Sequence, residues 1–182
     1  INLSRPFQLG DAGGGVAVSQ QGSTMEISGN ITGTGRFYKL GAGNLILSGN
    51  NTFSGELVVF ANTVAVNSAA AMGNGSTVIL NSGAATTFQS NANIVTDKNF
   101  LIVGTTVGTA LMTNETSVLA LTGQIGGNVT GTPLTKAGSG TLILTNANLF
   151  NGTFTIGDTA VTHRAGSDFA QPGGTVVLTG PD

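Results

Sequence analysis

The chain of 182 residues carries little charge: Asp, Glu, Lys and Arg make up 8% of it, and the formal net charge is −2. A surface that binds nucleic acid or acidic lipid needs clustered cations, but the six Lys and Arg residues are scattered along the sequence. This distribution excludes nucleic acid as an expected partner. The 40% of apolar residues argues against disorder, and the absence of cysteine excludes disulfides and thiolate metal sites.

Short apolar or alternating runs, each followed by Gly, Asn, Ser or Thr, recur along the whole chain. Runs rich in branched and aromatic residues predict short β-strands, and glycine and asparagine predict the tight turns between them. The segment NSAAAMG at 67–73 has a helical composition but is too short to form a helix alone. The sequence therefore predicts an all-β protein. In chain order, the expected strands lie at 15–18, 24–27, 44–48, 56–60, 63–66, 76–80, 99–103, 109–113, 117–121, 141–145, 153–156 and 175–179.

An internal repeat selects one architecture among the possible all-β folds. KLGAGNLILSGNNTFSGELVV at 39–59 aligns without a gap to KAGSGTLILTNANLFNGTFTI at 136–156. The match extends in both directions, which gives two repeat blocks at approximately 25–80 and 119–178. Self-similarity of this kind is typical of solenoids, in which each short unit stacks on the next.

We therefore expect a right-handed parallel β-helix of about seven to nine coils. Each strand would pair with its equivalent one coil away, at about 4.8 Å. Inward positions would hold Val, Ile, Leu and small residues, and glycine and asparagine would form the corners. We also expect the two blocks to lie in vertical register, with matching side chains inward. The structural positions expected from the repeat are Gly41, Gly43, Leu45, Leu47, Asn51, Phe53 and Gly55 in the first copy, and Gly138, Gly140, Leu142, Leu144, Asn148, Phe150 and Gly152 in the second.

These residues resemble the autotransporter-associated β-strand repeat, which is found in passenger domains of Gram-negative autotransporters. The resemblance is carried by KLGAGNLILSGNNTFSG and LTKAGSGTLILTNANLFNG, and by the preceding SGNITGTG at 28–35. The Gly-Gly pair of the family is replaced here by Gly55-Glu56 and by Gly152-Thr153. The resemblance implies a right-handed parallel β-helix that is exported through a C-terminal outer-membrane barrel, which this chain lacks, and that is displayed outside the cell.

The sequence offers few groups for catalysis. His163 is the only histidine, and Asp158 and Asp168 are the only acidic residues near it; the chain has no Gly-x-Ser-x-Gly segment for a nucleophile. The other acidic residues are spread singly. We therefore expect no catalytic residues and no metal site. A carboxylate groove assembled from several coils, as in polysaccharide-cleaving β-helices, stays open as an alternative.

Glycine-rich segments such as GDAGGGVAV at 10–18 lack the Gly-Lys-Ser/Thr sequence of a phosphate-binding loop and the βαβ unit of a dinucleotide fold. We therefore interpret them as corners and expect no cofactor.

Taken together, these observations predict a non-catalytic, structural or adhesive segment of an autotransporter passenger on the cell surface. Because the chain opens on Ile1 and not on Met, we expect residues 1–182 to be one segment of a larger protein. Partners would be a surface receptor or neighbouring passenger chains, contacted through an exposed face or through the loops Gly126–Pro133 and Arg164–Pro172. The alternatives are a β-helical enzyme that acts on carbohydrate and a module that assembles end to end into filaments, since the terminal coils have unpaired edges.

Overall fold

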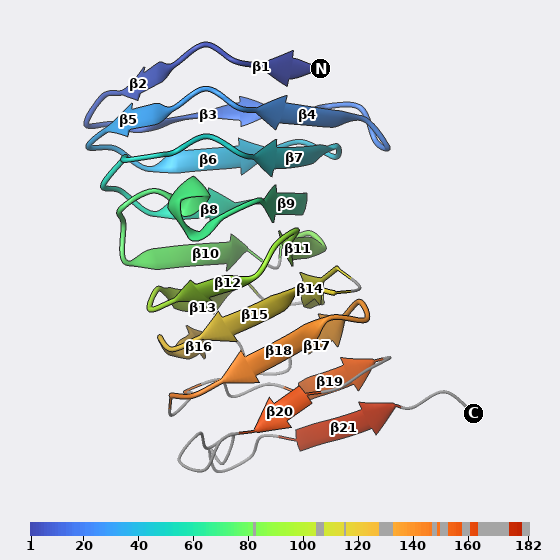
Figure 1. Cartoon of the computed structure of the whole chain (residues 1–182). Helices are drawn as coiled ribbons and strands as arrows, with labels where there is room; N and C mark the ends of the chain where they lie inside the picture. The colour runs from blue at the N-terminus through green and yellow to red at the C-terminus, as the bar shows by residue number, and fades with distance from the viewer. Residues whose placement is uncertain are drawn as a thin grey trace.

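The computed structural model describes residues 1–81, 83–104, 108–114, 116–127, 133–146, 149, 153–157, 161–163 and 175–179. Within these residues the chain winds into a stack of short strands that runs from residues 2–3 at one end to residues 175–179 at the other (Figure 1). Every strand pair is parallel, as the repeat predicts. The expected all-β, parallel solenoid is confirmed.

The strands form three walls, and each turn of the chain visits them in the same order. The first wall is a nine-stranded sheet of β1 (Asn2–Leu3), β4 (Thr24–Ile27), β7 (Asn44–Leu47), β9 (Asn62–Val66), β11 (Thr86–Ser90), β14 (Thr109–Thr113), β17 (Leu134–Ala137), β19 (Thr153–Gly157) and β21 (Thr175–Thr179). The second wall holds β2 (Phe7–Leu9) and β5 (Ile31–Gly33), and further along the stack β12 (Ile94–Thr96), β15 (Val118–Leu121), β18 (Thr141–Leu144) and β20 (Val161–His163). The third wall is a six-stranded sheet of β3 (Gly14–Ala17), β6 (Phe37–Leu40), β8 (Leu57–Val59), β10 (Thr77–Asn81), β13 (Asn99–Val103) and β16 (Ile125–Gly127).

Six consecutive turns carry a described strand in both the first and the third wall, and the first wall continues to nine strands. The structure therefore supports about six turns, fewer than the seven to nine coils expected from the sequence.

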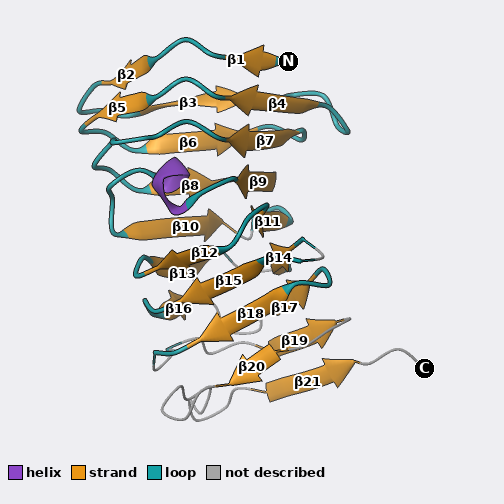
Figure 2. Cartoon of the chain, viewed as in Figure 1, coloured by secondary structure: helices purple, strands orange, loops and turns teal. Residues whose placement is uncertain are grey.

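In the part of the chain that the structure describes, one 3₁₀ helix, η1 (Ala69–Met72), interrupts the second wall at the sequence NSAAAMG (Figure 2). The Ser68 side chain accepts a hydrogen bond from the Ala71 backbone N–H and so caps the N-terminus of η1. Gly73 ends η1 at a φ of 74°. No helix among the described residues is long and apolar enough to cross a membrane.

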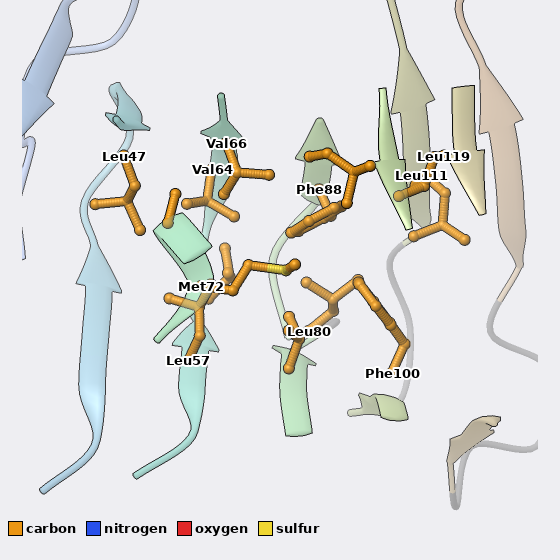
Figure 3. Close-up of a cluster of buried hydrophobic side chains, with 14 of the residues drawn as sticks. Leu47, Leu57, Val64, Val66, Met72, Leu80, Phe88, Phe100, Leu111 and Leu119 are labelled. Atoms are coloured by element: carbon orange, nitrogen blue, oxygen red, sulfur yellow. The ribbon is translucent and has the colours of Figure 1, made fainter. Parts of the chain in front are cut away.

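The interior is a narrow column of side chains contributed by all three walls. In β7, for example, Leu45 and Leu47 are fully buried, while Asn44 and Ile46 face outward and are half-buried. Figure 3 shows how Val64 and Val66 of the first wall face Leu57 and Leu80 of the third, with Met72 of η1 between them. Burial of apolar surface contributes about 25 cal/mol per Å², and this column is the main stabilising feature of the fold.

The expectation that the two repeat blocks lie in vertical register is wrong. The NLIL run of the first copy is β7 in the first wall, whereas the TLIL run of the second copy is β18 in the second wall. The turns differ in length: hydrogen bonds join equivalent positions 20 residues apart near β5 but 25 apart near β15. The residues between the copies therefore do not complete a whole number of turns, and the second copy is displaced by one wall.

Candidate functional site

The two repeats share a corner that is closed by a buried lysine. We call residues 39–43 and 136–140 the lysine–glycine corners. Lys39 ends inward in β6, and its Nζ donates hydrogen bonds to the carbonyl oxygens of Gly41 at 2.6 Å and of Ala61, one turn further on, at 2.7 Å. Lys136 in β17 makes the same contact with the carbonyl oxygen of Gly138. Both lysines are fully buried, so the ammonium groups satisfy carbonyls that water cannot reach.

The glycine of each corner is required by the backbone. Gly41 has a φ of 80° and Gly138 a φ of 77°, in the left-handed region that favours glycine. A Cβ atom would lie 2.4 Å from the carbonyl oxygen of Val18 at Gly41, and 1.9 Å from that of Thr113 at Gly138. The same local corner therefore forms on two different walls, which explains how the repeat survives the displacement of the second copy.

Burial lowers the pKa of Lys39 from its ordinary value of 10.5 to about 8. Between pH 8 and 10.5 the unfolded chain consequently binds more protons at this lysine than the folded chain does. The free energy of unfolding rises with pH wherever the unfolded state binds more protons. A neutral amine retains two N–H donors, so both carbonyl contacts persist after deprotonation.

We expect the contribution of Lys39 to stability to increase by on the order of 2 kcal/mol as the pH rises from 7.5 to 10. Urea unfolding of the wild-type chain and of Lys39→Met at both pH values measures this, because titration of all other groups cancels in the difference between the two proteins. A difference that stays constant with pH would contradict the depressed pKa.

Asparagine and a third lysine link successive turns at other corners. Asn51 is buried; its Oδ1 accepts from the Ile31 N–H at 2.8 Å and its Nδ2 donates to the Ala71 carbonyl oxygen at 2.6 Å. Lys98 is also buried, and its Nζ donates to the carbonyl oxygen of Gly75 in the preceding turn. Burial lowers the pKa of Lys98, and the charge of Asp97 opposes that shift.

At the corner that follows the first wall, the side chains of Asn67, Asn91 and Asn114 form a ladder along the stack. The Nδ2 atom of Asn91 donates to Asn67 Oδ1 at 2.8 Å, and Asn114 Nδ2 donates to Asn91 Oδ1 at 3.1 Å. The Gln89 amide bridges the lower two members. Such a ladder satisfies polar groups between coils and fixes their register.

The outer face of the third wall presents polar and charged side chains to solvent, where a partner would contact them. Phe37, Leu57, Val78, Phe100 and Ile125 stack inward and are buried. Side chains alternate along a strand, so the residue before each of them faces outward. These outward residues form a polar column along the axis: Arg36, Glu56, Thr77, Asn99 and Gln124.

The two ends of this column open into hollows. The upper hollow, of about 320 Å³, is lined by Asp11, Thr34, Arg36, Tyr38 and Glu56 around the backbone of Gly35 and Gly55. The lower hollow, of about 390 Å³, includes Thr77, Asn99, Leu101, Gln124 and Leu149.

An ion pair organises the upper hollow. Arg36 Nε donates to Glu56 Oε2 at 2.6 Å. The Arg36 guanidinium lowers the pKa of the Glu56 carboxyl, so Glu56 is ionised at neutral pH. Asp11 accepts a hydrogen bond from the hydroxyl of Thr34, which lies in the next turn. The Tyr38 ring lies 6.1 Å from that of Phe60, which is 39% exposed.

Those positions selected from the repeat that the structure describes lie in the interior or at corners, not at this face. Leu45, Leu47, Phe53, Leu142 and Leu144 are buried in the column. Gly43, Gly55 and Gly140 lie where a Cβ atom would approach the preceding turn to 2.5, 2.4 and 2.1 Å. Asn148, Phe150 and Gly152 lie outside the described residues, as do Asp158, Asp168, residues 128–132 of the loop Gly126–Pro133 and the whole of Arg164–Pro172. His163 belongs to β20, but its side chain is not among those described.

Sequence reasoning did not single out Arg36, Tyr38, Glu56 or Asp11. A signal was present, since Arg36 and Glu56 have opposite charge and are 20 residues apart, which is one turn. Within the described residues, no three or more His, Cys, Asp or Glu side chains are grouped closely enough to hold a metal ion.

Comparison with known proteins gives two matches. The profile of the passenger-associated-transport repeat matches residues 37–64 and 134–158, which contain the two lysine–glycine corners. A segment of 57 residues is 47% identical to the Adhesin BmaC autotransporter of Brucella suis biovar 1 (strain 1330), covering 31% of this chain and 2% of that protein. No solved structure gives a significant match.

The expected resemblance to autotransporter passengers is therefore confirmed at the two repeat copies, while the preceding segment at 28–35 lies outside the matched residues. Two segments of the chain, residues 37–64 and 134–158, are thus similar to the passenger-associated-transport repeat, and their described strands belong to a parallel β-solenoid.

Proposed function

We propose that this chain is a non-catalytic segment of a passenger displayed on the cell surface, where it serves as a stiff stalk and contributes to attachment. The observation that carries the proposal is the continuous nine-stranded parallel sheet, whose hydrogen bonds run along the axis of the stack. A rod of this kind resists bending and extension, because each described turn is bonded to the next through the strands of the first wall. Buried lysines and asparagine side chains add further bonds between some of the turns.

Surface display and adhesion rest on the comparisons. The passenger-associated-transport repeat and the similarity to a protein named an adhesin support both. The matched segment is 2% of that protein, so this chain would act as one module among many. Its part in attachment would be to extend the passenger and to present its outer faces.

Deletion of residues 1–182 from the parent passenger tests this role. We expect the shortened passenger to reach the cell surface, with a reach reduced by about 40 Å, from eight strand spacings of about 4.8 Å. We also expect attachment to host cells or matrix to fall several-fold. Surface labelling, electron microscopy and an attachment assay measure these three outcomes.

A spacer control separates the stalk from the adhesive contribution. An unrelated β-solenoid with the same number of turns should restore reach but not full attachment. Attachment that is unaffected by the deletion would contradict the proposal. Turnover of a polysaccharide by the isolated chain would contradict its non-catalytic part and favour a carbohydrate-active enzyme.

A further inference from the structure

The outer face of the third wall has the features of a binding surface for a chain-like polar ligand. The upper and lower hollows lie on this one face, and the polar column from Arg36 to Gln124 joins them. Four strand spacings separate the two ends of the column, or about 19 Å. The face is rigid, because every strand under it is bonded on both sides from β6 to β13. A ligand that lies along the axis would meet one outward polar residue of the column at each turn.

We propose that this face binds a neutral, unbranched oligosaccharide, with its best-defined subsite in the upper hollow. This proposal rests on the adhesive part of the proposed function and names the ligand class and the residues involved. Sugars expose hydroxyl groups, which both donate and accept hydrogen bonds, and C–H faces, which pack on aromatic rings. The upper hollow offers both kinds of partner.

The hydrogen-bonding partners in the upper hollow are already held in place. Glu56 and Arg36 fix each other through the 2.6 Å contact, and a weaker contact joins Arg36 Nη2 to Glu56 Oε1 at 3.5 Å. Thr34 holds the Asp11 carboxylate. Carboxylate oxygens that remain free accept from sugar hydroxyls, and the guanidinium donates to them. Because these groups are positioned before binding, little side-chain entropy is lost when a ligand arrives.

The aromatic partner is Tyr38, which faces outward from β6 between the buried Phe37 and Lys39. Its ring forms part of the wall of the hollow and lies against the exposed ring of Phe60. Aromatic rings supply a large, rigid contact area with a polar end, which suits a ligand that is apolar on one face and polar at its rim.

Charge and exposed area decide between ligand classes. The upper hollow contains two carboxylates, Asp11 and Glu56, and one guanidinium, Arg36, so its net charge is −1. This negative charge repels uronic and sialic acids and disfavours them as ligands. A stable protein partner needs about 1,000 Å² or more of buried surface with an apolar centre. Among the described residues of this face, the large apolar side chains exposed by more than a third are Leu40, Phe60 and Leu149. Leu149 lines the lower hollow, whereas Phe60 packs on Tyr38 of the upper one. These separated side chains form no apolar centre of the size that a protein partner needs, which favours a narrow polar ligand.

Calorimetric titration of the 182-residue chain with maltohexaose, cellohexaose and chitohexaose tests the proposal. We expect at least one of them to bind with a Kd below about 1 mM, and its disaccharide to bind at least 10-fold more weakly, because only the longer chain spans the column. We expect oligogalacturonate of the same length to bind at least 10-fold more weakly than the neutral hexasaccharide.

Substitutions locate the subsite. Tyr38→Ala should weaken binding at least 10-fold and Glu56→Gln several-fold, whereas Tyr38→Phe, which keeps the ring, should retain affinity within about 3-fold. Val95→Ala, at an exposed position on the second wall, is the matched control and should bind as the wild type does. Circular dichroism and thermal unfolding of each variant show whether it is folded.

Several results would overturn the proposal. They are no binding of any neutral hexasaccharide at millimolar concentration, preference for oligogalacturonate, unchanged affinity in folded Tyr38→Ala, or binding of an unfolded protein such as reduced casein with higher affinity than any sugar. If sugar binding fails while deletion of the segment still lowers attachment, this inference falls and the proposed function stands. If sugar binds while the deletion has no effect on attachment, the proposed function falls alone.

Discussion

Replacement of Gly41 by alanine is expected to lower the free energy of unfolding by about 3 to 5 kcal/mol. The left-handed backbone at a φ of 80° costs an alanine about 1 to 2 kcal/mol. The added Cβ would also lie 2.4 Å from the Val18 carbonyl oxygen in the preceding turn. That oxygen belongs to backbone and accepts the Gly43 N–H at 2.7 Å, so the clash adds about 2 to 3 kcal/mol. Urea unfolding monitored by circular dichroism measures the change.

Two glycines of the same chain serve as controls for the separate causes. Gly22 has a φ of 77°, but no atom lies within 4 Å of its virtual Cβ, so Gly22→Ala should cost only the backbone term of about 1 to 2 kcal/mol. Gly10 lacks both features, and Gly10→Ala should change stability by less than about 0.5 kcal/mol. If Gly41→Ala cost no more than Gly22→Ala, the close packing of turns at the corner would be contradicted.

The sequence was sufficient for the architecture because the relevant signals are local and repeated. Alternation along NLIL predicts inward Leu45 and Leu47, and the glycine-flanked runs predict short strands joined by corners. A chain of many such units with a repeated block has few ways to bury its apolar residues other than by stacking. Twelve expected strands thus lie among the strands of three parallel walls.

The register between distant turns could not be predicted in the same way. It depends on the sum of the corner lengths between the two repeats, and corners in a solenoid tolerate insertions that leave the strands unchanged. The longer segment before Lys136 is one such insertion. The lysine–glycine corner needs only the local backbone and the carbonyls of adjacent turns, so it forms equally well between the third and first walls and between the first and second.

The burial of lysine side chains was the second feature that the sequence pattern did not predict. Lysine is rarely buried, and scattered lysines were interpreted only as evidence against a cationic surface. In the structure, Lys39, Lys98 and Lys136 all end inside the stack on corner carbonyls. The common spacing of lysine two residues before a left-handed glycine identifies two of them, but the third has no such signature.

Asn51 offers the most direct test of how the turns are held together. Replacement by leucine, which has a similar volume, is expected to cost about 2 to 6 kcal/mol. The Ile31 N–H and the Ala71 carbonyl oxygen would each lose a partner, and a buried polar group left unsatisfied costs about 1 to 3 kcal/mol. These two groups belong to the turns on either side of Asn51, so the substitution uncouples three coils at one point. Urea unfolding measures the loss.

Two further variants distinguish lost hydrogen bonds from general disruption. Asn50→Ala changes an exposed neighbour whose backbone N–H, not its side chain, contacts Asn30, and it should shift stability by less than about 0.5 kcal/mol. Asn51→Asp keeps the acceptor for Ile31 but places a carboxylate against the Ala71 carbonyl oxygen. Burial raises the pKa of such a carboxyl, so the folded state binds more protons, and Asn51→Asp should become more stable relative to wild type as the pH falls from 7 to 5. Equal stability of Asn51→Leu and wild type would show that the strands alone hold the stack together.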